Sequence, residues 1–381
     1  MTAIVNASAT AERRSFTEVW VITVQAIASA LSNIPGGILV DSIGRKGLLM
    51  ALSLAWIGIP YLLMATTHSY ALLLCCAALI GVGNTLWHPS AIPTLASRFP
   101  DRKGTVVSIH GMGGNVGDAV APFVAGTLMS GIALFGVTLS FDLSWRQVMI
   151  YNVIPGIFMA AAILWFLGRT QMSAGKSGDK RLSLGEVLAG FGGLLRNRTL
   201  VMLSISSGFR SMTQSSLLVF IPLYLANVMG YSKASYGAAM MFLQLAGFIA
   251  APIAGSMSDT MGRRNIMMSA MAMTFVVLLM MIFAGGTPVF VFFVALLGFF
   301  LFAIRAVLQA WTLDATPKGM GGTAIGLLFG IQAIGQAIGP LMCGIIADHF
   351  GLLSTFYFMA GTIIVANLFV FTIPDHETAK A

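Results

Sequence analysis

The sequence has 381 residues, of which 57% are hydrophobic and 9% are charged, and its mean hydropathy is +0.89. Too few polar residues are available to cover a water-facing surface, so an ordinary soluble domain is excluded. The net charge of +8 does not indicate nucleic-acid binding, because the basic residues lie in short loops between apolar runs. Alternating strands of about 10 residues, which build outer-membrane barrels, are missing, so the chain is predicted to be an all-α integral membrane protein.

Apolar runs predict eleven membrane-spanning helices, at about 20 residues per crossing. In chain order the expected spans are 17–38, 47–67, 70–97, 104–128, 146–168, 199–228, 236–257, 266–285, 288–312, 322–346 and 352–373. Residues 129–145 either extend the fourth span or form an interfacial segment.

Residues 169–198 form the longest polar connection and divide the chain into a first bundle at 1–168 and a second bundle at 199–381. Ser183 and Glu186 have the spacing of a capping box. The helix that they open would carry four apolar side chains on one face, namely Leu184, Leu188, Phe191 and Leu195. We expect a linker helix that lies on the membrane surface.

The distribution of basic residues predicts the orientation. Fifteen of the 21 lysines and arginines share a side with the loop at Arg45 and Lys46, four lie on the other side, and Arg210 and Arg305 fall within spans. Because loops rich in Lys and Arg stay in the cytoplasm, this loop is expected to be cytoplasmic in a bacterial inner membrane.

An internal repeat sets the architecture. The string GGILVDSIGRK at 36–46 returns as AGSMSDTMGRR at 254–264, so that Asp41 corresponds to Asp259 at an offset of 218. The same offset relates Gly104 to Gly322. It also relates four further pairs, namely Thr105 to Thr323, Gly117 to Gly335, Pro122 to Pro340 and Gly126 to Gly344. A constant offset over four helices indicates two parallel repeats, an arrangement found in transporters whose halves rock about a central site.

The repeat also predicts a difference between the halves. The counterpart of the span at 199–228 would fall 218 residues earlier, near the start of the chain, so the first bundle is expected to lack its first helix. A misassigned start codon, a truncated gene and a genuine eleven-helix variant are the alternatives.

The repeated string resembles the signature loop of the major facilitator superfamily. Its members here are Gly37, Asp41, Gly44, Arg45 and Lys46, with Gly255, Asp259, Gly262, Arg263 and Arg264 in the second copy. The glycines allow close helix approach and a tight turn, and the aspartate can accept from N–H groups at a helix N-terminus and can pair with Arg45. The resemblance implies a conformational latch between the halves on the cytoplasmic side; a simple topology anchor is the alternative.

Two glycine-rich helices, HGMGGNVGDAVAPFVAG at 110–126 and IQAIGQAIGPLMCG at 331–344, look similar to the glycine–proline helix of the superfamily's antiporters. They contribute the expected hinge residues Gly113, Gly117, Pro122, Gly126, Gly335, Pro340 and Gly344. Small residues let helices touch and proline bends them, which favours export, although small residues also serve ordinary packing.

Ionisable groups within the spans are the candidate site, because each is costly in hydrocarbon unless it is paired or hydrated. Asp118 lies about 21 Å along its helix from Gly104 and is the first candidate for proton binding; neutralisation by an arginine is the alternative. Arg210 and Arg305 each have a glutamine four residues on, Gln214 and Gln309, and would suit an anionic or polar substrate. Either arginine could instead extend toward the interface.

A second polar group surrounds the string WHP. Asn84 and His88 are one turn apart, and Trp87 adjoins them. His88 and His110 are candidates for proton relay, although a merely hydrogen-bonded histidine is an equal alternative for His88.

Several strings, including WHP, HGMGGNVGDAVAP and GIIADHFG, are similar to the fosmidomycin-resistance type of efflux protein within the superfamily. Ala77 stands where drug–proton antiporters of the better-known type carry an arginine, so their proton mechanism does not transfer. The resulting hypothesis is proton-coupled efflux of a small molecule by a monomer in the lipid bilayer. Proton-coupled uptake and a non-transporting membrane sensor are the alternatives. No enzyme motif, cofactor motif or metal-ligand spacing is found, and the three cysteines lie in apolar runs.

Overall fold

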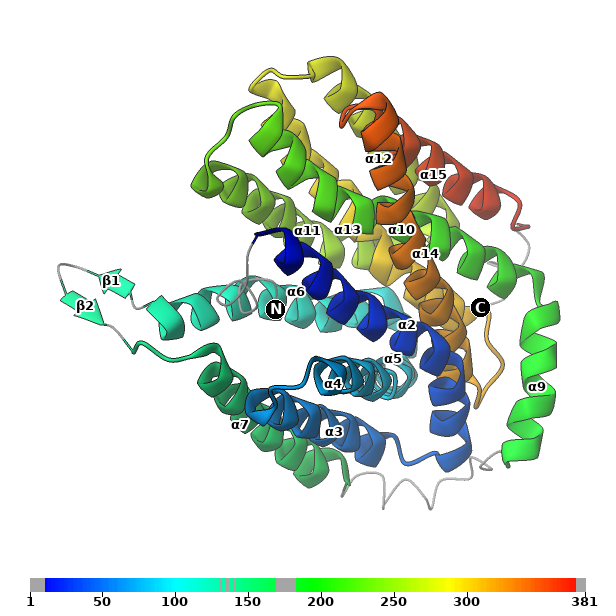
Figure 1. Cartoon of the computed structure of the whole chain (residues 1–381). Coiled ribbons are helices and arrows are strands. Elements are labelled where there is room, and N and C mark those ends of the chain that lie inside the picture. Colours follow the sequence, from blue (N-terminus) through cyan, green and yellow to red (C-terminus); the bar gives the residue numbers. More distant parts are fainter. Residues whose placement is uncertain (1–10, 131, 135–136, 140, 169–182, 375–381) are drawn as a thin grey trace.

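The computed structural model describes residues 11–130, 132–134, 137–139, 141–168 and 183–374. Figure 1 shows long helices gathered in one body. Before the linker these are α2 (Ala11–Ile43), α3 (Lys46–Thr66), α4 (Tyr70–Asn84), α5 (Trp87–Arg98), α6 (Lys103–Ser130) and α7 (Trp145–Ile163). After it come α10 (Arg198–Asn227), α11 (Lys233–Met261), α12 (Arg263–Ala284), α13 (Val289–Asp314), α14 (Gly321–Phe350) and α15 (Ser354–Phe371). The all-α prediction is confirmed.

Each of the eleven expected spans corresponds to one of these helices, except that the span at 70–97 is divided between α4 and α5 and the span at 146–168 ends in a π-helical turn at Leu164–Gly168. Nine helical segments of the described residues are long and apolar enough to cross a membrane. The two other expected spans are α6 and α10, with 28 and 30 residues, which are also of spanning length. We refer to α2–α7 as the first half and to α10–α15 as the second half; the bundle boundaries at 168 and 198 stay a prediction.

The expected single span at 70–97 is broken into α4 and α5. Thr85 follows α4, and its hydroxyl donates to the carbonyl oxygen of Val82 at 2.7 Å. Pro89 has no N–H to donate to the carbonyl oxygen of Thr85, so the regular hydrogen-bond ladder cannot continue through this turn. His88 therefore lies in the first turn of α5, which begins at Trp87, rather than in a continuation of α4.

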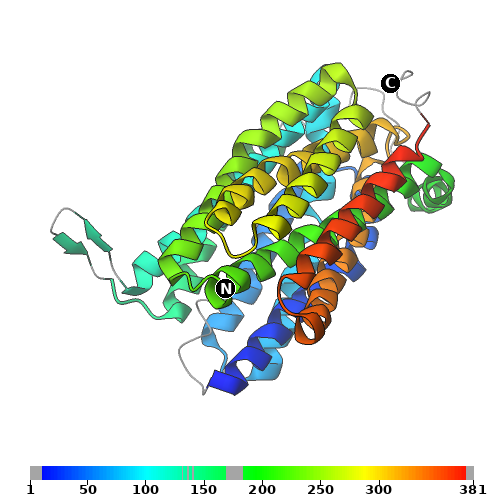
Figure 2. The same cartoon turned by 90° about the horizontal axis from the view of Figure 1, so that it is seen from above.

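Residues 129–145 contain a hairpin, which neither of the predicted alternatives included. Strands β1 (Ile132–Leu134) and β2 (Val137–Leu139) pair in antiparallel register, with Ala133 opposite Thr138. The hairpin projects from one end of the helical body, and the linker helix α9 (Leu184–Arg196) lies toward the opposite end (Figures 1 and 2).

The capping box of α9 is confirmed. Ser183 Oγ accepts from Glu186 N–H at 3.2 Å, and a Glu186 carboxylate oxygen accepts from Ser183 N–H at 2.7 Å. The helix packs on the protein through Val187 and Leu194, which are buried with Met320, and through Phe191 of the predicted apolar face, which is half-buried against them. Leu184, Leu188 and Leu195 are exposed, so contact with a membrane surface stays a prediction.

Apolar packing is most extensive in the second half. Tyr224, Phe290 and Phe356 form an aromatic cluster with ring centroids 4.8–5.6 Å apart. The halves meet through two main helix pairs, α2 with α14 and α6 with α11. These two pairs carry the residues of the predicted latch. We call the contact of α2 with α14 the first latch and that of α6 with α11 the second latch, and the latch function itself stays a prediction.

Candidate functional site

The first latch joins Asp41 of α2 to the beginning of α14. Gly322 N–H donates to one carboxylate oxygen at 2.9 Å, and the other oxygen accepts from Thr323 N–H at 2.6 Å and from its hydroxyl at 2.7 Å. These amides belong to the first turn of α14, where the helix dipole favours a negative charge. Asp41 is 6% exposed, so its hydrogen bonds are shielded from water.

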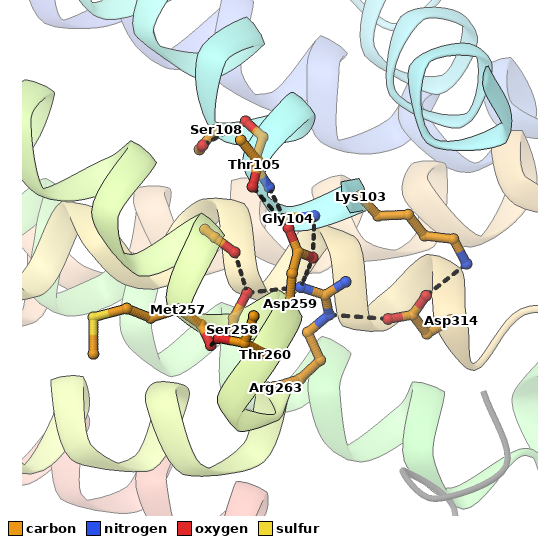
Figure 3. A network of polar contacts seen from close by, with 11 residues as sticks. Lys103, Gly104, Thr105, Ser108, Met257, Ser258, Asp259, Thr260, Arg263 and Asp314 are labelled. Carbon is orange, nitrogen blue, oxygen red and sulfur yellow. Dashed lines mark hydrogen bonds and ion pairs between the residues drawn. The ribbon is translucent and has the colours of Figure 1, made fainter. Parts of the chain in front are cut away.

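The second latch repeats this arrangement with the halves exchanged (Figure 3). Asp259 of α11 accepts from Gly104 N–H at 2.8 Å and from Thr105 N–H and hydroxyl at 2.9 and 2.8 Å. The partners of the two aspartates are themselves related by the 218-residue offset. The repeat in the sequence is therefore a repeat of contacts between the halves.

Paired glycines allow the backbones to meet at both latches. A Cβ at Gly37 would lie 2.4 Å from the carbonyl oxygen of Gly322, and one at Gly255 would lie 2.5 Å from that of Gly104. No side chain fits at these distances, which confirms the predicted close approach. The predicted tight turns are also confirmed, because Gly44 and Gly262 have positive φ angles of 69° and 91°.

The two latches differ in their arginines. Arg263 donates to Asp259 at 2.5 Å, whereas the predicted pair between Arg45 and Asp41 is not formed. Arg45 is exposed in the turn between α2 and α3, and Lys46 is the basic residue whose charge acts on Asp41. The difference arises from where the following helices begin. Arg263 is the first residue of α12, whereas Arg45 precedes α3, which begins at Lys46.

An acidic residue that the motif analysis missed strengthens the second latch. Asp314, the last residue of α13, accepts from Arg263 at 3.0 Å and from Lys103 of the first half at 2.7 Å (Figure 3). By the 218-residue offset, Asp314 corresponds to Ala96 and Lys103 corresponds to Gly321. Neither Ala96 nor Gly321 is charged, so the first latch has no equivalent of this ion pair. Only the second latch therefore has an ion pair between the halves among the described residues.

Lys103→Met is expected to weaken the second latch modestly. The pair with Asp314 is partly exposed, at 24% and 14% of the side-chain surfaces, so we expect a coupling energy of about 1 kcal/mol. A double-mutant cycle with Asp314→Asn, measured by thermal unfolding in detergent, checks this value. Lys318→Met, in the exposed turn after α13, is the matched control. A coupling energy of zero would mean that the ion pair adds nothing to the latch.

A small pocket lies between the halves, next to the second latch. It is formed by α5 and α6 of the first half and by α11 and α13 of the second. Its polar lining consists of His88, Ser108, His110, Arg305 and Gln309. We call it the central pocket. Four of the predicted site residues, namely His88, His110, Arg305 and Gln309, are thus brought together.

Aromatic contacts position the two histidines. His88 stacks on Phe329 of α14 with ring centroids 4.8 Å apart and an interplanar angle of 5°. His110 lies edge-on to His88 at 6.0 Å and stacks with Trp87 at 6.2 Å. The contact with Phe329 crosses from one half to the other, and a separation of the halves must change it.

Arg210 of α10 is one of the most buried side chains of the described structure, with 1% exposure. Within the described part of the chain it donates a long hydrogen bond of 3.4 Å to the hydroxyl of Ser211, while Nε and one terminal nitrogen have no partner there. Arg210 does not line the central pocket in this conformation.

The remaining predicted site residues are placed differently. Asn84 ends α4 and is exposed, so it does not share a helix face with His88 as predicted. Gln214 is half-buried on α10 away from the central pocket, whereas Gln309 is 4% exposed and lines it. Asp118 lies in α6, eight residues after His110, and its side chain is outside the described residues.

Only some of the expected hinge glycines lie in close contact with a neighbouring helix. A Cβ at Gly335 would lie 2.2 Å from the carbonyl oxygen of Gly208, so α14 and α10 touch there as predicted. At Gly113, Gly117 and Gly344 no described atom lies within 4 Å of the same position, so the structure shows no close contact there and the hinge role of these three stays a prediction. Pro340 is half-buried within α14, and the side chains at Pro122 and Gly126 are outside the described residues.

Comparison with known families agrees with this geometry. The family described as Major Facilitator Superfamily matches residues 15–249 and, in a second match, residues 203–381. The chain belongs to the major facilitator superfamily. The protein is therefore a multi-pass membrane protein of a transporter family.

The individual relatives share about a quarter of their residues with this chain. An uncharacterized MFS-type transporter YfnC of Bacillus subtilis is 24% identical over 322 residues, which cover 83% of this chain and 74% of the relative. The fosmidomycin resistance protein of Escherichia coli is 26% identical over 327 residues, 83% of this chain and 73% of that protein. The predicted similarity to the fosmidomycin-resistance type is thus confirmed as one similar subgroup.

Among solved structures, the proton:xylose symporter XylE has a TM-score of 0.76 at 16% identity. The match covers 98% of this chain and 90% of that chain. This likeness confirms the fold of the superfamily and carries no information on the solute.

Proposed function

We propose that the chain exports a small molecule across the bacterial inner membrane by alternating access, driven by proton entry. The observation that carries the proposal is the combination of two repeat-related latches at one end of the molecule with a pocket of ionisable side chains beside them. Both features involve residues from both halves, so a rocking motion would alter them together.

The latches supply the conformational element. Each holds the two halves together through a carboxylate at a helix N-terminus, and the loop with Arg45 and Lys46 lies on the side expected to be cytoplasmic. Breaking both latches would open the pocket toward the cytoplasm for loading. Re-forming them would close that side and leave the outer side to open.

The coupling element is assigned to Asp118, with His88 and His110 as relay groups. Asp118 lies about 12 Å along α6 from His110, so transfer between them requires water. A proton that enters from outside would be released to the cytoplasm as the latches open. The resistance function in the name of the Escherichia coli relative supports the export direction.

Everted membrane vesicles test the direction. Radiolabelled fosmidomycin is the first probe, because a relative is named for resistance to it, followed by a panel of toxic compounds. Export by antiport predicts that the compound accumulates inside everted vesicles while protons leave them. Asp348→Asn, at the exposed end of α14, should behave as the wild type. No transport of any compound, in either direction, would contradict the proposal.

Uptake by proton symport is the second candidate function. It is supported by the basic character of the central pocket, because an anion and a proton would strengthen each other's binding there. In everted vesicles, symport predicts that the compound and protons move in the same direction. The same experiment therefore separates the two candidates.

A further inference from the structure

The linker helix α9 packs across the first latch and contacts both halves. Its inner face is formed by Val187 and Leu194, which are 0% and 1% exposed. Both are buried in one cluster with Met320, the residue before α14, and Ile38 of α2 packs against that cluster. Figure 1 shows α9 running across the end of the helical body rather than along it. The linker therefore places a helix over the contact of α2 with α14.

The residues that α9 contacts lie within one helical turn of the latch groups. Met320 is two residues before Gly322, whose N–H donates to the carboxylate of Asp41. Ile38 is three residues before Asp41, on the same side of α2. A Cβ at Gly190 would lie 2.5 Å from the sulfur of Met320, so the backbone of α9 lies directly against that side chain. If the start of α14 moves away from α2, α9 must lose its contact with one of them.

The end of α9 is anchored to the second half. The side-chain amide nitrogen of Asn197 donates to the carbonyl oxygen of Ala315, just after α13, at 3.1 Å. The side-chain oxygen of Asn197 accepts from Leu200 N–H at 3.3 Å, in the first turn of α10. The helix is thus held on the second half at this end, and its packing against Ile38 reaches the first half.

The opposite face of α9 is apolar and exposed. Leu184, Leu188 and Leu195 are 54%, 51% and 49% exposed, and the exposed Arg196 and Arg198 follow them. Because α9 crosses the ends of the membrane-spanning helices, this face is placed at the depth of the lipid headgroups. An apolar helix face beside basic side chains fits the interface of a bilayer that contains anionic lipids, such as the cytoplasmic leaflet.

We propose that the leucine face of α9 docks on an anionic lipid surface and that this docking holds the first latch closed. A docked α9 stays at the level where its inner face contacts Ile38 and Met320 together. A surface that binds this arrangement in preference to the open one stabilises it by mass action. Membrane composition would then control the opening of the first latch. The inference uses the latch of the proposed function but not its solute.

Hydrogen exchange of the whole protein in lipid nanodiscs tests this inference. Nanodiscs of phosphatidylcholine alone are compared with nanodiscs of phosphatidylcholine mixed with anionic phosphatidylglycerol. The amides of Gly322 and Thr323 report on the first latch, and those of Gly104 and Thr105 report on the second. We expect anionic lipid to slow exchange at the first latch by at least about fivefold, the effect of about one arginine at an anionic surface.

Three outcomes of this comparison would overturn the proposal. Exchange at Gly322 and Thr323 could be the same in both lipids, or it could be faster with phosphatidylglycerol, which would mean that the lipid pulls α9 away from the latch. An equal slowing at both latches would show a general stabilisation of the protein instead of an action through α9.

Two variants separate the two faces of α9. Leu188→Gln changes the exposed face and should remove the effect of anionic lipid, while the exchange rate in phosphatidylcholine stays that of the wild type. Val187→Gln changes the inner face and should speed exchange at Gly322 and Thr323 in both lipids. Glutamine favours a helix at least as well as valine and about as well as leucine, so neither change should unfold α9.

The role of charge is tested by combining Arg196→Gln with Arg198→Gln, which should also remove the effect of anionic lipid. Arg102→Gln removes an exposed arginine in the turn before α6 and is the matched control, which should keep the effect. A lipid effect of wild-type size in the double variant would overturn the inference, even if Val187→Gln does not fold. Because no solute is added, this result is independent of whether the protein exports any compound.

Discussion

Asp41→Asn is expected to lower the rate of transport by at least about tenfold. The carboxylate accepts three hydrogen bonds at the start of α14, and an amide can offer only one oxygen and a repelling NH₂ group. Removing one partner of buried charge-assisted hydrogen bonds costs about 2–4 kcal/mol, which corresponds to a shift of about 30- to 1,000-fold in the balance between latched and open conformations.

Hydrogen exchange followed by mass spectrometry measures this shift directly. Peptides that contain Gly322 and Thr323 should exchange faster in Asp41→Asn, because their amides lose an acceptor. Asp348→Asn changes an exposed aspartate at the other end of α14 and should leave the pattern unchanged. Wild-type exchange and wild-type transport in Asp41→Asn would show that the first latch is only a topology anchor.

The equivalent change in the second latch should have a smaller effect. In Asp259→Asn, Arg263 still pairs with Asp314, and Lys103 still joins Asp314 across the halves. The difference between the two variants is therefore a measure of how much the ion pairs contribute beyond the repeated hydrogen bonds.

Asp118→Asn is expected to abolish proton-coupled movement while the protein still folds. An amide of nearly the same shape cannot bind and release a proton. Proteoliposomes containing a pH-sensitive dye should show no proton movement when solute is added, whereas exchange of labelled for unlabelled solute, which needs no proton, should continue. The coupling loss is expected to be complete rather than partial.

Asp101→Asn is the matched control for this experiment, because Asp101 is exposed in the short turn before α6. Wild-type proton movement in Asp118→Asn would remove Asp118 from the mechanism. The relay would then have to begin at His88 or His110, and His110→Gln would become the decisive variant.

The sequence was most informative about the helices and about the loops that the internal repeat makes equivalent. Apolar runs predicted the helices, and the 218-residue offset predicted two equivalent loops, because a duplicated chain keeps its spacing. The type of partner for Asp41 was also predicted, since a carboxylate near a helix N-terminus finds free amides. The identity of that partner, 281 residues away, depends on how the halves pack and could not be predicted from local pattern.

Two features of the site were missed although the sequence holds a partial signal for them. Asp314 follows the apolar run of α13 directly, and Lys103 precedes that of α6, so both could have been considered as end charges. Nothing in either local pattern pairs them, because the contact joins different halves. The stacking of His88 on Phe329 is a tertiary contact of the same kind.

The break between α4 and α5 was predictable in principle. Pro89 withholds one backbone donor, which is a known signal for a helix boundary. The mostly apolar character of the run at 70–97 outweighed that signal and led to the prediction that Asn84 and His88 share a face. Hydrophobicity reports membrane crossing, not helical continuity.

Because only the second latch has an ion pair between the halves among the described residues, we expect the two latches to open in a preferred order. The α2–α14 seam has no salt bridge across it among the described residues, so it should part first while the α6–α11 seam acts as the pivot. Release or loading would then occur from one flank of the molecule rather than through a symmetric mouth. Because the Lys103–Asp314 bridge is partly water-exposed, raising the ionic strength should loosen the pivot and make the two flanks more alike.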